Sequence, residues 1–184
     1  MPKLGLLSDN VGMAYSGMGP DSRVLLRKGR KVGQQYWMQY KDAIPVASMV
    51  RDLAAVMQEY TQSGGVRPFG VSLLVAGYDD LGPQLYQVDP SGSFWAWKAS
   101  AIGRNMNNAK TFLEKRYPQD DPATGIVAQP LELEDAIHTT ILTLKDGFEG
   151  AMNEYSIEIG VVTEDRVFRI LTPKQVREYL DVLA

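Results

Sequence analysis

The sequence of 184 residues contains no cysteine and a single histidine. Without thiols the chain forms no disulfide, offers no thiolate nucleophile and binds no metal through sulfur. One imidazole likewise excludes a histidine-rich metal centre, because such a centre draws several ligands of that type. This composition is typical of an intracellular protein, and we expect neither a cofactor nor a metal site.

Long apolar runs and an excess of basic charge are also absent. No run approaches the ~20 residues that a membrane helix needs, and residues 1–8 are too short for a secretory signal. The formal net charge of -3 provides no basic surface for nucleic acid or for an anionic membrane, so we expect neither partner. The densest basic cluster has the spacing of a helix face and indicates a solvated or interfacial surface rather than a DNA contact. It comprises Arg23, Arg27, Lys28, Arg30 and Lys31.

Turn residues between apolar runs are what the sequence does contain. Within Gly64–Gly92, the strand-like segments Val71–Tyr78 and Gln84–Val88 are separated by Gly82 and Pro83, which supply the positive or fixed φ of a tight turn. The pattern predicts an antiparallel hairpin. No residue of this run combines a nucleophile with a neighbouring base, so the run indicates architecture and no chemistry.

Apolar periodicity along the whole chain predicts an order of two strands, two helices, three strands, two helices, two strands and one helix. The connections between consecutive strands are too short for parallel crossovers, so the strands are expected to be antiparallel. We therefore predict an α+β sandwich of two facing sheets with helices on their outer sides, formed by a single domain over residues 1–184. The strands are predicted at Leu4–Ser8, Val11–Ser16, Val71–Tyr78, Gln84–Val88, Ser93–Ala101, Tyr155–Val161 and Arg166–Leu171.

The helix predictions differ in strength. The helix that begins near Pro20 contains Gly29 and Gly33, which weaken the prediction because each glycine costs about 1 kcal/mol relative to alanine. The helix around Leu133–Phe148 has the clearest apolar stripe, and the last helix begins with a capping box at Thr172. Tyr117–Pro130 is predicted to be an exposed loop. The first helix is expected to place Leu25, Val32, Tyr36 and Tyr40 on one face.

Four separated motifs resemble one known family. They are Tyr15–Asp21 (YSGMGPD), Arg67–Gly77 (RPFGVSLLVAG), Tyr86–Ser93 (YQVDPSGS) and Leu131–His138 (LELEDAIH). In this order they are similar to the α-type subunits of the eukaryotic proteasome core particle, and to the type 2 class most of all. The resemblance covers nearly the whole chain.

The resemblance implies a fold and a role. It implies a four-layer αββα sandwich of the N-terminal-nucleophile hydrolase type, without the N-terminal helix and first two strands that family members place before the position of Leu4. It also implies a non-catalytic subunit of the heteroheptameric α-ring that supports ring assembly and ubiquitin-dependent protein degradation in cytoplasm and nucleus. The implied partners are the other α subunits, the β subunits and, through the assembled ring, regulatory particles or activators. The helices at Asp21–Lys41 and Pro45–Gln62 would face the adjoining ring.

No catalytic, cofactor-binding or metal-binding residue is predicted. Catalytic relatives of this fold use an N-terminal threonine whose free amine serves as base, whereas this chain begins with Met1 and Pro2. Thr139 and Thr140 lie inside a predicted helix, where no free amine is available. His138 could serve as a general base, but its spacing from the acids one helical turn earlier favours a local ion pair.

Two further groups have structural interpretations. The acids Glu132, Glu134 and Asp135 could form a metal or acid–base cluster, but acids at a helix start are expected because they complement the helix dipole. Trp95 and Trp97 share a face of their predicted strand and could line a pocket or an interface. Packing between the sheet and a helix is the interpretation that we favour for them.

Two alternative functions belong to other classes. The chain could be a self-standing hydrolase of the same fold, which requires a processed N-terminal nucleophile, or an inert homo-oligomeric binding module. Without two of the family's strands, sheet edges would be unpaired and core surface exposed. We therefore expect the isolated chain to be poorly stable or to associate through the vacant edge.

Overall fold

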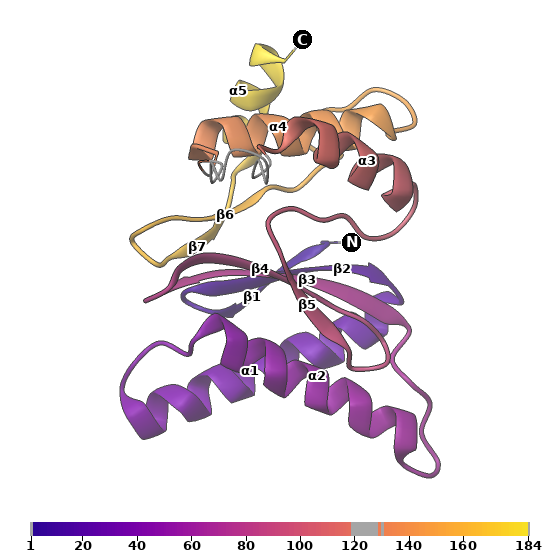
Figure 1. The fold of residues 1–184 in the computed structure, drawn as a ribbon, viewed down its shortest axis with the longest axis vertical. Coiled ribbons are helices and arrows are strands. Elements are labelled where there is room, and N and C mark those ends of the chain that lie inside the picture. The colour runs from indigo at the N-terminus through magenta and orange to yellow at the C-terminus, as the bar shows by residue number, and fades with distance from the viewer. Residues whose placement is uncertain (1, 119–128, 130, 184) are drawn as a thin grey trace, which may run out of the picture. The chain divides into compact units, whose positions relative to one another are not determined.

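The computed structural model describes residues 2–118, 129 and 131–183 (Figure 1). Its elements follow the order predicted from the sequence. They are β1 (Leu4–Ser8), β2 (Val11–Gly17), α1 (Gly19–Tyr40), α2 (Val46–Gln62), β3 (Val71–Asp79), β4 (Gly82–Val88), β5 (Phe94–Trp97), α3 (Met106–Arg116), α4 (Leu133–Asp146), β6 (Gly160–Val162), β7 (Phe168–Ile170) and α5 (Pro173–Val182). Most of the loop predicted at Tyr117–Pro130 lies outside the described residues.

The chain forms two compact units. The first comprises Met1–Lys98 and Glu158–Leu171, and the second comprises Ala99–Ile157 and Thr172–Ala184. The prediction of a single domain over residues 1–184 stays a prediction. In the part of the chain that the structure describes, no helix is both long and apolar enough to cross a membrane.

The first unit contains a five-stranded sheet in the order β1-β2-β3-β4-β5, antiparallel throughout. Its hairpins agree with the predicted ones, including β3–β4, where Asp79 lies opposite Gly82. Alternate residues of β3 are fully buried, which is the period expected of a strand with one face on the core. The alternation therefore sets which side of the sheet receives the helices.

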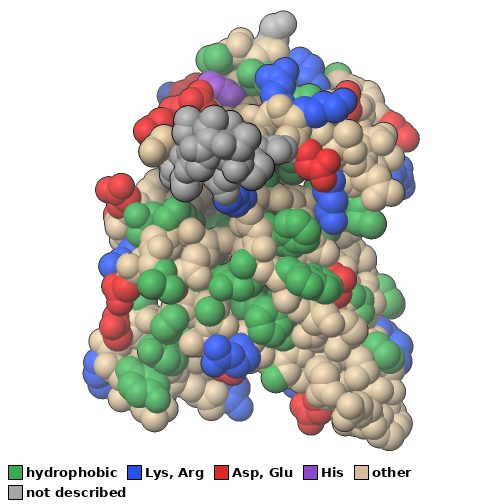
Figure 2. Space-filling model, in the orientation of Figure 1, with side chains coloured by type: hydrophobic (Ala, Val, Ile, Leu, Met, Phe, Trp, Pro, Cys, Tyr) green, Lys and Arg blue, Asp and Glu red, His purple; other side chains and the backbone are tan. Residues whose placement is uncertain are grey.

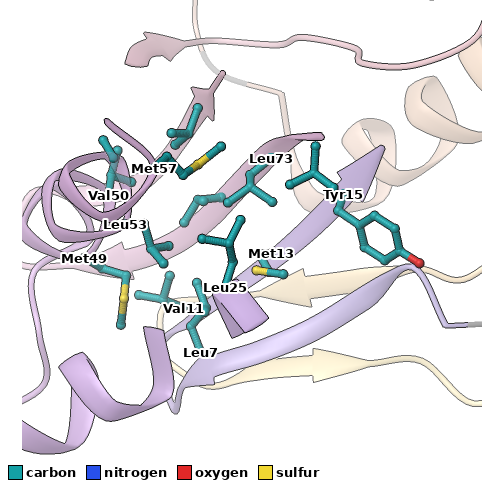
Figure 3. Packing of buried hydrophobic residues seen from close by; sticks show 14 of the residues in the cluster. Leu7, Val11, Met13, Tyr15, Leu25, Met49, Val50, Leu53, Met57 and Leu73 are labelled. Atoms are coloured by element: carbon teal, nitrogen blue, oxygen red, sulfur yellow. The ribbon is translucent and has the colours of Figure 1, made fainter. Parts of the chain in front are cut away.

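Helices α1 and α2 cover one face of this sheet (Figure 1). Side chains of α2 at helical spacing meet the buried side chains of the strands, as Figure 3 shows for Met49 and Leu53 against Val11 and Leu73. The resulting hydrophobic core belongs to the first unit. Its largest fully buried side chains include Leu25, Ile44, Met49, Leu53, Met57 and Leu73.

Glycines in α1 allow this helix to approach strand β1 closely. A Cβ on Gly29 would lie 2.5 Å from Leu7 Cδ2, and one on Gly33 would lie 3.3 Å from Ser8 Cβ. The two glycines that weakened the helix prediction therefore stabilise the packing, because the close contact with β1 compensates for their low helical propensity.

The opposite face of the sheet receives the two-stranded antiparallel sheet β6–β7. Phe168 of β7 packs on Gly12 of β2, where a Cβ would lie 2.2 Å from the ring, and its N–H donates to the Asp9 carbonyl at 2.7 Å. Two sheets thus pack face to face, as predicted. The α+β class expected from the sequence is confirmed.

One predicted strand is much shorter than expected. Alternation favoured a strand over Tyr155–Val161, but β6 begins only at Gly160. Asn153 forms local hydrogen bonds instead: its Oδ1 accepts from Tyr155 N–H at 2.9 Å, and its carbonyl accepts from Ser156 N–H at 3.0 Å. Such a turn removes backbone groups from a ladder. The strand predicted at Ser93–Ala101 is also shorter than expected: β5 begins at Phe94 and ends at Trp97.

The second unit is helical in its regular structure, with α3, α4 and α5. Ile137 and Ile141 of the predicted α4 stripe are buried, whereas Leu133 and Leu144 are exposed. Helix α5 begins with the predicted capping box, in which Thr172 Oγ1 accepts from Gln175 N–H and the Gln175 side chain accepts from Thr172 N–H.

Candidate subunit interface

The threonines considered as nucleophiles lie in helix α4. Thr140 Oγ1 donates to the Ala136 carbonyl at 2.7 Å, and the Thr139 carbonyl accepts from Thr143 Oγ1 at 2.7 Å. These are bonds within the helix, whose interior offers no free amine as a base. The interpretation of Thr139 and Thr140 as structural residues therefore fits their surroundings.

His138 lies against α5 and forms an ion pair with neither Glu134 nor Asp135, so the prediction of a local pair was wrong. Its Nε2 is buried without a hydrogen-bond partner, and its ring meets that of Tyr179 edge-on at 5.7 Å. Glu134 Oε1 accepts from Tyr179 Oη at 3.0 Å instead. Burial, followed by this hydrogen bond, raises the pKa of Tyr179. The contact therefore joins α4 to α5.

The acids at the start of α4 do not form a metal site. Among the residues that the structure describes, no group of three or more histidine, cysteine, aspartate or glutamate side chains could hold a metal ion. That catalytic, cofactor and metal residues are absent from the chain as a whole stays a prediction.

Helix α1 ends in large apolar side chains that face solvent. Trp37, Met38 and Tyr40 are 52%, 68% and 57% exposed. Tyr36 and Tyr40 stack at 4.5 Å between ring centroids, and Lys41 Nζ lies 4.5 Å from the Trp37 ring. We call Trp37, Met38 and Tyr40 the aromatic end of α1. Figure 2 shows hydrophobic side chains gathered at the lower left, where α1 ends.

A basic row precedes the aromatic end on the same helix. Arg23, Arg27, Arg30 and Lys31 are exposed, and Arg30 Nε donates to the Leu6 carbonyl at 2.8 Å. Helix α1 carries five basic residues and one acidic residue, Asp21, which is buried. Aromatic side chains, methionine and arginine are enriched at protein interfaces, whereas aspartate and glutamate are depleted there. The exposed side of α1 has this composition.

Hydrogen bonds of two aspartates, the buried Asp21 and the half-buried Asp79, fix α1 and α2 on the sheet. Asp21 accepts from both terminal nitrogens of Arg67 and from Gly70 N–H, and these hydrogen bonds lower the pKa of its carboxyl group. Asp79 Oδ2 accepts from Val46 N–H at 2.9 Å, so the end of β3 caps the start of α2. The outer surface of the helix pair is therefore held in place before any partner binds.

The two tryptophans of strand β5 are exposed, so the interpretation that they pack between the sheet and a helix was wrong. Trp95 and Trp97 are 46% and 42% exposed. The register pairs them with Gln87 and Leu85, which places both on the face of the sheet opposite α1 and α2. Because β5 is the last strand of the sheet, its side chains have strand neighbours on one side only.

No local sequence pattern indicates the partners of Asp21 and Asp79, because each contact joins residues more than thirty positions apart. A signal for the aromatic end was present. Trp37, Met38 and Tyr40 follow the basic row within one helix, and a mixed aromatic and cationic helix surface is a pattern that sequence reasoning can recognise.

Comparison with known proteins relates the chain to one family. The family model described as Proteasome subunit matches residues 1–162. The chain is 62% identical over 178 residues to "Proteasome subunit alpha type-2-A" of Arabidopsis thaliana, which covers 97% of this chain and 72% of that protein. It is 60% identical over 179 residues to "Proteasome subunit alpha type-2" of Oryza sativa subsp. japonica, and the match covers 97% of this chain and 72% of that protein. For the protein of that name from Drosophila melanogaster the identity is 52% over 178 residues, and the match covers 97% of this chain and 71% of that protein.

Proposed function

This chain belongs to the proteasome subunit family, and we propose that it is a non-catalytic, structural subunit of the α-ring of the proteasome core particle. The observation that carries the proposal is its similarity to α type-2 subunits along 97% of its length. In this role it supports ring assembly and thereby protein degradation in cytoplasm and nucleus. It breaks no peptide bond itself.

Two observations support the absence of catalysis. The Thr140 hydroxyl group is hydrogen-bonded to the carbonyl of Ala136 within helix α4, and the ring of His138 packs edge-on against that of Tyr179. Both threonines lie inside helix α4, where no free amine is available as a base. The alternative of a self-standing hydrolase requires a nucleophile that is paired with such a base.

The partners we propose are the neighbouring α subunits, the β subunits and, through the assembled ring, regulatory particles. The exposed side of α1 is the surface that we assign to a neighbouring subunit. Its basic row would steer an acidic partner surface into place, and its aromatic end would supply the desolvated centre of the contact. The hydrogen bonds of Asp21 and Asp79 support this assignment, because a rigid surface loses little entropy on binding.

Incorporation into core particles tests the proposal. A tagged copy is expressed in a eukaryotic host, particles are purified in their native state, and subunits are counted by mass spectrometry. We expect the tagged chain among α and β subunits. Trp37→Glu should reduce incorporation, because a carboxylate would be desolvated in the contact, whereas Asn107→Glu at an exposed position of α3 should not. A chain recovered only as a small species would contradict the proposal.

A peptidase assay on the purified chain separates the alternatives. The proposal predicts no cleavage of fluorogenic peptides above the buffer rate at any subunit concentration. Turnover that a threonine-reactive inhibitor abolishes would favour the self-standing hydrolase. An inactive chain that excludes other subunits from its complexes would favour the binding module.

A further inference from the structure

Strand β5 forms one edge of the five-stranded sheet and carries aromatic side chains on both of its faces. Trp95 and Trp97 lie on the face opposite the helices, and Phe94 lies on the helix side, 6.5 Å from Tyr86 between ring centroids. Phe94 is 40% exposed, close to the fractions of the two tryptophans. In Figure 2 hydrophobic side chains gather over the strands of this sheet. An exposed apolar edge strand is a surface through which sheets associate.

The β4–β5 ladder determines which backbone groups of β5 point outward. Asp89 N–H donates to the Ser93 carbonyl at 2.9 Å, so these two residues form a hydrogen-bonded pair. Hydrogen-bonded and non-hydrogen-bonded pairs alternate along an antiparallel ladder. With Gln87 opposite Trp95 and Val88 opposite Phe94, the N–H and C=O groups of Phe94 and Ala96 point to the outer edge.

We propose that β5 pairs antiparallel with β5 of a second copy, across a two-fold axis beside Ala96. In this register Ala96 lies opposite its own equivalent, so its outward N–H and C=O groups exchange two hydrogen bonds. Trp95 lies opposite Trp97 of the partner subunit, and the reverse pair follows by symmetry. Directly opposite aromatic side chains stabilise a sheet. The edge is thus self-complementary, as a two-fold interface requires.

The area available sets the strength of this dimer. An aromatic side chain buries about 150–250 Å² when fully covered, so the exposed parts of Phe94, Trp95 and Trp97 amount to roughly 400–640 Å² over both copies. A stable interface buries about 1,200–2,000 Å² in total. The dimer is therefore weak and depends on protein concentration. The inference concerns the isolated chain and is independent of the proposed function.

Cysteine cross-linking tests the register, because the chain has no cysteine of its own. Residues in a hydrogen-bonded antiparallel pair have Cα atoms about 5.5 Å apart, so two thiols at this position lie within reach of a short bismaleimide linker. Ala96→Cys should give a cross-linked dimer with this reagent, and Thr61→Cys, at a site on α2 that is also exposed, should not. Equal cross-linking of both variants, or none at Ala96, would overturn the register.

A charge exchange tests the interface without depending on cross-linking. One variant carries Trp95→Glu and Trp97→Glu, and the other carries Trp95→Lys and Trp97→Lys. Sedimentation velocity should show each variant as a monomer at concentrations where the unmodified chain dimerises, and a mixture of the two should restore the dimer. Circular dichroism verifies that both variants are folded. Three results would refute the proposal. The unmodified chain could stay monomeric at every concentration, the dimer could survive in either variant, or the edge could bind an added apolar peptide but no second copy.

Discussion

Asp21 and Arg67 form a two-point ion pair between the first turn of α1 and the segment that enters β3. Nη1 of Arg67 donates to Oδ2 of Asp21 at 2.7 Å, and Nη2 donates to Oδ1 at 2.9 Å. Gly70 N–H donates to the same Oδ2 at 2.9 Å. Both carboxylate oxygens are thus occupied, and one side chain fixes the start of the helix relative to the sheet beneath it.

Replacing the carboxylate by an amide should destabilise the chain. Asp21→Asn keeps the shape but directs an NH2 group at a donor, whichever way the amide is turned. We expect the free energy of unfolding to fall by about 1–3 kcal/mol, the usual cost of losing hydrogen bonds to a charged group. Urea unfolding followed by circular dichroism measures this. Asp52→Asn, on the exposed side of α2, is the control and should change little.

The same pair predicts a dependence of stability on pH. The hydrogen bonds from Arg67 and Gly70 lower the pKa of Asp21 in the folded chain. A lowered pKa adds stability above the unfolded value of about 4, and this stability is lost as the pH falls below it toward the folded value. The difference in unfolding free energy between the unmodified chain and Asp21→Asn should therefore narrow below about pH 4. A difference that is constant from pH 7 to pH 3 would refute the linkage.

The order of strands and helices was predictable because apolar period depends on local sequence. Alternation in Val71–Asp79 and helical spacing in Val46–Gln62 record which face of each element is buried. Such predictions fail where local hydrogen bonds compete with strand pairing. Tyr155–Ile159 alternates like a strand, yet the side chain and carbonyl of Asn153 bind the following backbone N–H groups.

Other features depended on contacts that no local pattern reports. Gly29 appeared to weaken a helix and instead allows Leu7 of another element to approach. Trp95 looked like a packed residue, because the sequence does not tell which strand forms an edge. The basic row of α1 was predicted as solvated or interfacial, whereas the aromatic end was missed although it follows that row on the same helix.

The contact between the two sheets of the first unit predicts a steric conflict. A Cβ on Gly12 would lie 2.2 to 2.4 Å from the Phe168 ring. Gly12→Ala should therefore lower stability by about 1–3 kcal/mol, the cost of overpacking a core. Gly64→Ala is the control, since nothing lies within 4 Å of a Cβ at that position.

A double mutant tests the cause of that loss. Phe168→Leu alone should destabilise the chain by removing ring contacts, but it makes room for the alanine methyl group. The two substitutions together should therefore cost less than the sum of their separate effects, by about 0.5–3 kcal/mol of coupling. Additive losses in urea unfolding would show that the conflict lies elsewhere.

Replacing the side-chain amide of Asn10 by a carboxylate should lower the stability of the chain strongly. Its side chain is buried, and Nδ2 donates to the carbonyls of Ile44 and Tyr78 at 3.0 and 3.1 Å. Asn10→Asp replaces this donor with a carboxylate oxygen that faces two carbonyl oxygens. An uncompensated buried charge costs on the order of 3–5 kcal/mol, and unfolding in urea at pH 7 should show this loss, whereas Asn107→Asp on exposed α3 should not.

The chemistry of that variant also fixes the sign of its pH dependence. A carboxyl group beside carbonyl oxygens is favoured in its protonated form, which donates to one of them, so folding should raise the pKa of the introduced acid. A raised pKa means that stability is lost as the pH rises through the folded value. Asn10→Asp should therefore be closest in stability to the unmodified chain near pH 4 and farthest from it at neutral pH. An equal deficit at both pH values would show that Asn10 acts through its shape and not through the two hydrogen bonds that it donates.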